Sequence, residues 1–270
     1  MSEAASKTSA SGDRPRLLDW LVTPGFLLGF GATLLVFDPL QRVARLFGQR
    51  PQEWVAGTLQ GALVWVFRLA GTRLYVERDP GVKPGRSYLF IANHQSMFDV
   101  PIFGALLFRN FPKYISKREL AQGIPSISYN LRRGGNAIID RDDRQGATRA
   151  IRELGTQVRE RGVSAVIYPE GTRARRGELR AFKPAGALAL LDAAPEVPVV
   201  AVAIDESWRL LRFNLFPIPF GVNVRVRIGP PVERAEGEDR LALLESARSE
   251  IARALESWRG APPAAPEKDG

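Results

Sequence analysis

The sequence contains no cysteine and only one histidine in 270 residues. The absence of cysteine excludes disulfide bonds, thiolate nucleophiles and zinc sites built on cysteine. A single histidine also excludes a metal site with several imidazole ligands, so we expect no metal ion in this protein. His94 is therefore the one obvious general base for chemistry near neutral pH.

Acidic residues are the minority among the charged side chains. The chain has 38 Lys and Arg against 29 Asp and Glu, which gives a formal net charge of +9. Such an excess favours a polyanionic partner. The sequence has no helix-turn-helix, zinc-finger or RNA-binding aromatic signature, so we expect no nucleic-acid partner. An anionic membrane surface is the better explanation of the charge.

His94 lies in the segment Asn93-His94-Gln95-Ser96-Met97-Phe98-Asp99, in which four residues separate it from a carboxylate. These two positions lie well apart around a regular helix, so Asp99 can orient His94 only where a loop leads into a helix. We expect a strand before His94 and Asp99 in the first turn of the following helix, where the helix dipole favours a negative charge. One ring nitrogen would bond to Asp99, and the other would act as the base.

A second motif, Tyr168-Pro169-Glu170-Gly171-Thr172-Arg173, follows another apolar strand. Gly171 permits a tight turn that approaches a ligand closely. Arg173 offers a planar pair of donors that suits a phosphate group. Ligand sites in α/β sheets lie beyond the strand ends, so the two motifs can converge there. Together they indicate an acyl-transfer site.

Four blocks between Leu74 and Pro231 resemble the lysophosphatidic acid acyltransferases, which belong to the glycerolipid acyltransferase superfamily. The motifs at His94 and Glu170 are the first and third blocks, and Phe182-Lys183 and Gly186 follow the third. The second contains Lys117-Arg118-Glu119-Leu120, Pro125, Gly135 and Ile138-Ile139-Asp140-Arg141, and the fourth is Val197-Pro198-Val199-Val200. Mild departures from the usual residues occur at Ser128, Tyr168, Ala174 and Ala201.

The resemblance implies transfer of a fatty acyl group from acyl-CoA or acyl carrier protein to the free hydroxyl of a lysophospholipid. Lysophosphatidic acid is the expected acceptor, and no bound cofactor is expected. The candidate catalytic residues are His94 and Asp99, with His94 as the general base. The candidate substrate-binding residues are Lys117, Arg141, Glu170, Gly171, Thr172, Arg173 and Lys183. Arg141 and Arg173 are the main candidates for the acceptor's phosphate.

Two uncharged apolar runs precede these motifs, Trp20 to Phe37 and Trp54 to Phe67. The first reaches the lower length limit for a membrane-spanning helix, and the second is more typical of an interfacial or re-entrant segment. Their tryptophans suit a membrane interface. We expect residues 17–72 to form membrane-associated helices that hold the catalytic domain on the cytoplasmic side, which is the inner membrane in a bacterium. The alternative is that both runs are core helices of a soluble domain.

Residues 73–258 are expected to form the acyltransferase domain, because strands and helices alternate there. This alternation predicts an α/β fold with a mixed, largely parallel sheet flanked by helices. The expected strands are Leu74–Glu77, Tyr88–Ala92, Lys113–Ser116, Ala137–Asp140, Ala165–Tyr168, Val199–Ile204 and Val222–Ile228. The expected helices are Val100–Phe108, Arg144–Arg161, Pro184–Leu191 and Arg240–Trp258. Residues 1–16 and 259–270 are expected to be disordered tails.

Two other functions are compatible with the residues alone. A serine hydrolase or lipid esterase could use Ser96 with His94 and Asp99, although Ser96 is only two residues from His94 and the chain has no Gly-x-Ser-x-Gly elbow. Such an enzyme would release free fatty acid without an acceptor. A basic, non-catalytic membrane-binding protein with a vestigial motif would bind lipid without turnover.

Overall fold

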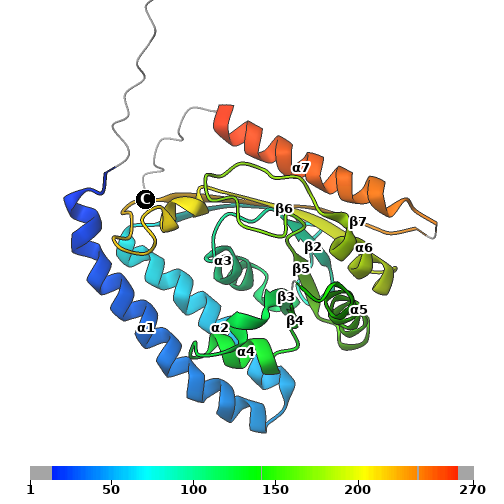
Figure 1. Cartoon of the computed structure of the whole chain (residues 1–270), viewed down its shortest axis with the longest axis horizontal. Helices are drawn as coiled ribbons and strands as arrows, with labels where there is room; N and C mark the ends of the chain where they lie inside the picture. Colours follow the sequence, from blue (N-terminus) through cyan, green and yellow to red (C-terminus); the bar gives the residue numbers. More distant parts are fainter. Residues whose placement is uncertain (1–13, 141, 236, 261–270) are drawn as a thin grey trace, which may run out of the picture.

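A central sheet with helices on both faces forms the fold of the computed structural model, which describes residues 14–140, 142–235 and 237–260 (Figure 1). The seven strands are β1 (Arg73–Arg78), β2 (Leu89–Ala92), β3 (Pro112–Lys117), β4 (Ala137–Ile139), β5 (Ser164–Ile167), β6 (Val199–Asp205) and β7 (Asn223–Val232). Their order is β1-β7-β6-β2-β5-β3-β4. Only the β6–β7 pair is antiparallel, so the predicted mixed, largely parallel sheet is confirmed.

The central strands are buried on both faces, which explains their uninterrupted apolar sequences. In β2, Leu89 and Ile91 pack on the layer formed by α5 (Arg144–Arg161), α6 (Pro184–Ala193) and α7 (Arg240–Gly260). The alternate residues, Phe90 and Ala92, pack on the opposite layer. That second layer contains α1 (Leu17–Leu46), α2 (Gln49–Val66) and α3 (Asp99–Leu106) (Figure 1).

All seven predicted strands are present, and each of the four predicted helices is found with its ends shifted by at most two residues. α5 spans the predicted residues. A short helix that the sequence reasoning did not predict, α4 (Ile127–Arg133), follows β3. Four 3₁₀ turns complete the described chain: η1 (Phe67–Ala70), η2 (Phe108–Asn110), η3 (Arg118–Ala121) and η4 (Ser207–Leu211).

α1 and α2 form an N-terminal helical hairpin (Figure 1). Within the described residues, α1 is the one helix that is long and apolar enough to cross a membrane. Its outward face is apolar, since Leu21 is 67% exposed, Leu28 74% and Leu35 64%. Its inward face carries Phe26, which is buried against Phe67 and Phe98. These features fit the predicted association with a membrane.

Hydrogen bonds hold α1 against the sheet domain near both of its ends. Near the N-terminal end, Thr23 Oγ1 accepts from the Ile218 N–H at 2.8 Å and Asp19 accepts from the Phe220 N–H at 2.8 Å. Near the other end, Asp38 accepts from the Ser126 N–H at 2.7 Å. The helix therefore extends beyond the predicted run, because the two aspartates that bounded the run both have partners.

α2 covers the second apolar run, and it packs between α1 and α3 with polar residues at its start buried. Glu53 is 4% exposed and accepts from Lys113 at 2.8 Å and from Arg161 at 2.6 Å. The hairpin and the sheet share one apolar core, which contains Phe26 and Val66 beside Phe90 and Val200. The predicted boundary at residue 72 therefore divides the chain into two segments, but the two segments share one hydrophobic core.

The predicted tails are partly wrong at their inner ends. Arg259 and Gly260 belong to α7, because Arg259 is held by an ion pair with the buried Asp205 at 2.7 Å. Arg16 precedes α1 and its backbone N–H donates to Asp19 at 2.8 Å. The rest of the two predicted tails, 1–13 and 261–270, lies outside the described residues.

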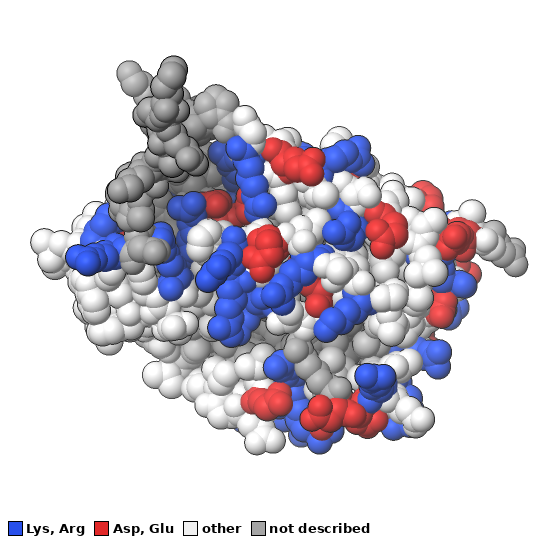
Figure 2. Space-filling model, turned by 45° about the horizontal axis from the view of Figure 1, so that its top comes forward, with Lys and Arg blue, Asp and Glu red and all other residues white. Residues whose placement is uncertain are grey.

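The charged side chains are unevenly distributed over the surface. Figure 2 shows a face on which Lys and Arg side chains gather with Asp and Glu between them, whereas the lower left of the same view is almost free of charge. The outer face of α1 supplies exposed apolar surface of this kind, from Leu17 to Phe47. A basic face and an apolar helix are thus both available to an anionic lipid surface.

Candidate active site

His94 lies in the loop that follows β2, and Asp99 is the first residue of α3. The Nδ1 atom of His94 is 2.8 Å from Oδ2 of Asp99. This is the geometry predicted from the spacing of the two residues, a strand that leads through a loop into a helix. Within the described residues the other ring nitrogen, Nε2, has no hydrogen-bond partner, and the His94 side chain is 17% exposed. The imidazole therefore has one nitrogen fixed and one available.

The Asp99 carboxylate is fully buried and is surrounded by hydrogen-bond donors. Besides His94, its Oδ2 atom accepts from the backbone N–H groups of Gln95 at 2.7 Å and Ser96 at 2.9 Å. Its Oδ1 atom accepts from the hydroxyl of Ser207 at 2.5 Å. Donors on both oxygens stabilise a negatively charged acceptor in a site without water contact. The carboxylate can therefore hold the imidazole in one orientation.

Glu170 connects the second motif directly to the first. Its Oε1 atom accepts from the His94 backbone N–H at 2.7 Å, and its Oε2 atom accepts from the Arg180 N–H at 3.1 Å. Burial raises the pKa of Glu170, and the two backbone donors oppose that shift. The predicted convergence of the motifs is confirmed, and the contact shows that Glu170 acts on the backbone of the histidine loop.

The loop from Gly171 to Lys183 lies beside His94. The Ala174 N–H donates to the His94 carbonyl at 2.7 Å, so Arg173 directly precedes a residue bonded to the histidine. Gly171 has φ +67°, a conformation that glycine adopts without strain. A Cβ atom at Gly171 would lie 3.7 Å from the Lys183 ammonium. The loop is thus bonded to the His94 backbone, and it holds Lys183 near Gly171.

The remaining predicted binding residues are Lys117 and Arg141, which belong to a different part of the sequence from the two motifs. Lys117 is exposed at the end of β3, and within the described chain its side chain makes no hydrogen bond or ion pair. Arg141 lies outside the described residues. Lys117 pairs with Ile139 of β4, so it lies near the strand end that leads to Arg141. Within the described residues, no hydrogen bond or ion pair joins Lys117 to the His94 loop.

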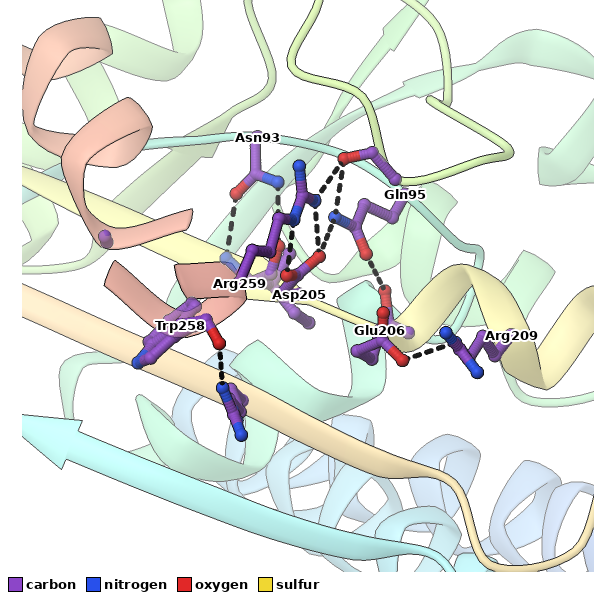
Figure 3. Close-up of polar contacts among 12 residues, drawn as sticks. Asn93, Gln95, Asp205, Glu206, Arg209, Trp258 and Arg259 are labelled. Carbon is purple, nitrogen blue, oxygen red and sulfur yellow. Dashed lines mark hydrogen bonds and ion pairs between the residues drawn. The ribbon is translucent and has the colours of Figure 1, made fainter. Parts of the chain in front are cut away.

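Several residues around the pair were not predicted, and Figure 3 shows their contacts. Gln95 Nε2 donates to Asp205 Oδ1 at 3.0 Å, and Arg259 binds both oxygens of Asp205 at 2.9 and 2.7 Å. Arg259 also donates to the Gly177 carbonyl at 2.6 Å. Asn93 makes two bonds of 2.8 Å with the backbone of Ile204. The end of α7 therefore joins the histidine loop, the Gly171–Lys183 loop and the end of β6.

Tyr168 forms an apolar wall of the site. Its ring stacks on the imidazole of His94 with 4.1 Å between the ring centroids. Burial raises the pKa of Tyr168, and its hydroxyl has no hydrogen-bond partner within the described residues. The ring of Tyr168 is therefore a packing surface for the histidine.

The geometry does not favour Ser96 as a nucleophile. The Ser96 side chain is fully buried, and its Oγ atom accepts from the Phe98 N–H at 3.1 Å. It makes no bond to His94, whose Nδ1 atom is already bonded to Asp99. A nucleophilic serine needs its base within hydrogen-bond reach. The arrangement instead presents a free imidazole nitrogen beside a basic loop, which suits deprotonation of a hydroxyl on a phosphate-bearing molecule.

Known proteins share both the sequence pattern and the fold. Residues 73–205 match the family model described as Acyltransferase. The chain is 26% identical over 178 residues to the 1-acyl-sn-glycerol-3-phosphate acyltransferase of Limnanthes douglasii, a match that covers 64% of this chain and 58% of that protein. It is 30% identical over 139 residues to the lyso-ornithine lipid O-acyltransferase of Pseudomonas aeruginosa, and 52% of each chain is covered. The chain spans little more than half the length of these relatives.

The fold is that of the crystal structure of the 1-acyl-sn-glycerophosphate (LPA) acyltransferase PlsC from Thermotoga maritima. The two structures align with a TM-score of 0.75 over 91% of this chain and 98% of that chain, at 21% sequence identity. The likeness includes the helical hairpin, because it extends well beyond residues 73–205. The predicted family is confirmed for residues 73–205: they match the acyltransferase family, and relatives of this chain include 1-acyl-sn-glycerol-3-phosphate acyltransferases.

Proposed function

We propose that this protein transfers a fatty acyl group from a thioester, acyl-CoA or acyl carrier protein, to the free hydroxyl of a lysophospholipid. The observation that carries the proposal is the 2.8 Å contact between His94 and Asp99, made beside the Glu170–Arg173 motif. Family membership supports the same reaction class. Lysophosphatidic acid is the favoured acceptor, which would make the product phosphatidic acid.

In the proposed mechanism, His94 Nε2 removes the proton of the acceptor hydroxyl while Asp99 holds Nδ1. The oxygen attacks the thioester carbonyl carbon, a new C–O bond forms and the C–S bond breaks. The imidazolium then returns its proton to the leaving thiolate, so the base is regenerated. The Asp99 carboxylate stabilises the intermediate imidazolium. No covalent acyl-enzyme is required.

The acceptor's phosphate would bind the cations that lie beside His94. Arg173 and Lys183 belong to the loop whose Ala174 N–H bonds to the His94 carbonyl. Arg173 is half-buried, whereas Lys183 is exposed. A guanidinium binds two phosphate oxygens at once, and the ammonium adds a single point charge. By the resemblance, Arg141 would contribute a second guanidinium and Lys117, which pairs with Ile139 of β4, a further charge.

A lyso-ornithine lipid is the second candidate acceptor. The observation that favours it is the 30% identity to the Pseudomonas aeruginosa protein of that name. Such an acceptor carries an amino-acid head group in place of a phosphate, so its recognition would depend less on a guanidinium fork. The acceptor panel described below separates the two.

The protein would lie on the membrane with α1 along the surface. Hydrogen bonds near both ends of α1 hold it to the sheet domain, and its 30 residues correspond to a length of about 45 Å. A helix bound in this way along its length cannot cross the bilayer without drawing the domain in. The exposed leucines would enter one leaflet, with the active site open to the cytoplasm, where both thioester donors occur.

The test is an acyl-transfer assay with purified full-length protein, lipid vesicles, both donors and a panel of lysolipids. We expect transfer to lysophosphatidic acid and no release of fatty acid without an acceptor. His94→Ala should lower kcat by at least ~10², since general-base catalysis contributes that much. Asp99→Asn should also lose activity, and Asp192→Asn, an exposed carboxylate paired with Arg240, is the matched control. Near-normal turnover by His94→Ala would refute the mechanism.

A further inference from the structure

Ser207 contacts the Asp99 carboxylate from a distant part of the chain. Its hydroxyl donates to Asp99 Oδ1 at 2.5 Å, and 108 positions separate the two residues. Ser207 begins η4, directly after β6, and both side chains are fully buried. The contact lies on the side of the carboxylate that faces away from His94, whose Nδ1 bonds to Oδ2.

The two oxygens of Asp99 are held very differently. Oδ2 accepts three hydrogen bonds, from the imidazole and from the N–H groups of Gln95 and Ser96. Within the described residues Oδ1 accepts only one, from Ser207. A buried carboxylate oxygen without a donor is strongly destabilising. Ser207 is therefore the one side chain that completes the surroundings of this oxygen.

The position of the Ser207 hydroxyl is itself fixed. Glu206, the residue before it, has φ +69°, which sets a sharp turn at the end of β6. Gln95 Oε1 lies 3.5 Å from the Ser207 hydroxyl, and the Gln95 amide nitrogen is bound to Asp205. A hydroxyl has one proton to donate. The shorter contact and the charge of the acceptor direct that proton to Asp99.

We propose that Ser207 is a positioning residue for acyl transfer, which holds the Asp99 carboxylate so that Oδ2 faces His94 Nδ1. The proposal rests on the proposed function, in which His94 is the base. Without the hydroxyl, the terminal torsion of Asp99 is less restricted, because rotation about an sp³–sp² bond has a broad energy profile. The imidazole then loses part of its fixed orientation, and fewer encounters with the acceptor hydroxyl are productive.

The kinetic test compares Ser207→Ala with Ser207→Thr, which keeps the hydroxyl. Ser164→Ala is the matched control, because Ser164 is also fully buried and hydrogen-bonded, but at the opposite end of β5 from the motif. We expect Ser207→Ala to lower kcat about tenfold with KM changed less than about twofold, on the scale of one hydrogen bond to a charged group. Ser207→Thr should recover most of the rate, and the control should match wild type. If the alanine variant does not fold, Ser207→Cys, with its weaker donor, should give a smaller loss.

A spectroscopic readout is available because His94 is the only histidine. In protein labelled with ¹⁵N-histidine, every imidazole signal belongs to the site. The proton on Nδ1 should be observed in wild type and Ser207→Thr, and it should shift or exchange faster in Ser207→Ala. The other charged groups near the pair, Glu170 and the Asp205–Arg259 pair, are unchanged in these variants.

Three results would overturn the proposal. One is a kcat for Ser207→Ala that equals that of Ser164→Ala. Another is a lower kcat with an unchanged imidazole spectrum, because Ser207 would then act by a different route. The last is a changed spectrum with an unchanged kcat, because the contact would then have no effect on turnover. The spectrum requires no substrate. If the wild-type protein had no transferase activity, the proposed function would be refuted, but the spectrum would still test the contact between Ser207 and Asp99.

Discussion

Replacement of Glu53 by glutamine should destabilise the protein by an amount that depends on pH. Glu53 joins α2 to the sheet domain, because its carboxylate contacts Lys113 at 2.8 Å, Arg161 at 2.6 Å and Arg50 at 3.2 Å. Burial alone would raise the pKa of Glu53, but Lys113 and Arg161 favour the ionised form and lower it. The amide of glutamine keeps the shape of the side chain and removes the charge.

The size of the destabilisation depends on how each of the three cations responds to the loss of the Glu53 charge. Arg50 and Arg161 have side chains that are 42% and 26% exposed, so both can turn toward water. Lys113 is 5% exposed and cannot, and an unpaired charge of this kind costs about 3–5 kcal/mol. However, burial already lowers the pKa of Lys113 to about 8. Loss of its proton at pH 7 therefore costs only about 1.4 kcal/mol, at 1.36 kcal/mol for each pH unit.

Loss of the proton from Lys113 costs less free energy than burial of its unpaired charge, so it limits the loss of stability. With about 1 kcal/mol more for the lost hydrogen bond of Arg161, we expect the free energy of unfolding to fall by about 2–3 kcal/mol at pH 7. That corresponds to about 4–12 °C in Tm for a chain of this size. Below pH 8 the unfolded variant binds a proton on Lys113 that its folded form lacks, so its stability rises with pH. The deficit relative to wild type should therefore grow by about 1.4 kcal/mol for each pH unit from 8 toward 6.

The assay is denaturant or thermal unfolding in detergent at pH 6, 7 and 8. Glu77→Gln is the matched control, because its carboxylate pairs with Arg227 at the surface with 55% of its side chain exposed. A surface pair contributes at most about 1 kcal/mol. If Glu53→Gln is no less stable than Glu77→Gln, or if its deficit does not change between pH 6 and 8, the reasoning about Lys113 is wrong.

Three further predictions concern the membrane face, the acceptor and the helix packing. Leu28→Lys with Leu35→Lys should weaken binding to anionic vesicles by at least about tenfold without a loss of Tm, measured by flotation, because both side chains point outward. Arg173→Lys should raise KM for lysophosphatidic acid about tenfold, with a smaller effect on acceptors that lack a phosphomonoester; equal effects would exclude a phosphate contact. Gly57→Ala should destabilise the protein by about 1–3 kcal/mol, since its Cβ would lie 2.0 Å from the Phe108 ring. Gly61→Ala should instead stabilise it by about 0.5–1 kcal/mol, because the space around Gly61 is open. Unfolding curves in which both variants change stability in the same direction would contradict this.

Local sequence patterns were sufficient to predict most of the fold. β7 alternates buried Val224, Val226 and Ile228 with partly exposed Arg225 and Arg227, as its period of two predicts. The ends of α5 follow from Asp143, which caps the helix by accepting from the Gly146 N–H, and from Gly162, which is left-handed. These signals lie within a few residues of the feature that they determine.

Features that depend on distant partners were not predictable in the same way. Asp19 and Asp38 break the hydropathy of the first run. Local partners, Arg16 and Arg42, bind the two carboxylates, but the N–H groups of Phe220 and Ser126 that also bind them come from distant parts of the chain. The His94–Asp99 geometry was predicted because a strand and a helix fix it locally. The Ser207 contact was not, because no pattern in the sequence relates the turn after β6 to the histidine loop.

The attachment of α1 to the loop that contains Ile218 and Phe220 has a consequence for biosynthesis. The bonds that Asp19 and Thr23 make with this loop join residues 201 and 195 positions apart. At about 5–20 residues per second, the ribosome needs about 10–40 s to make that length of chain. During this interval Asp19 and Thr23 lack these partners, and the outer leucines of the first helix are exposed. A nascent chain that reaches a bilayer early can shelter the helix there, whereas one that is delayed presents it to other chains, so yield should depend on how soon the ribosome meets a membrane.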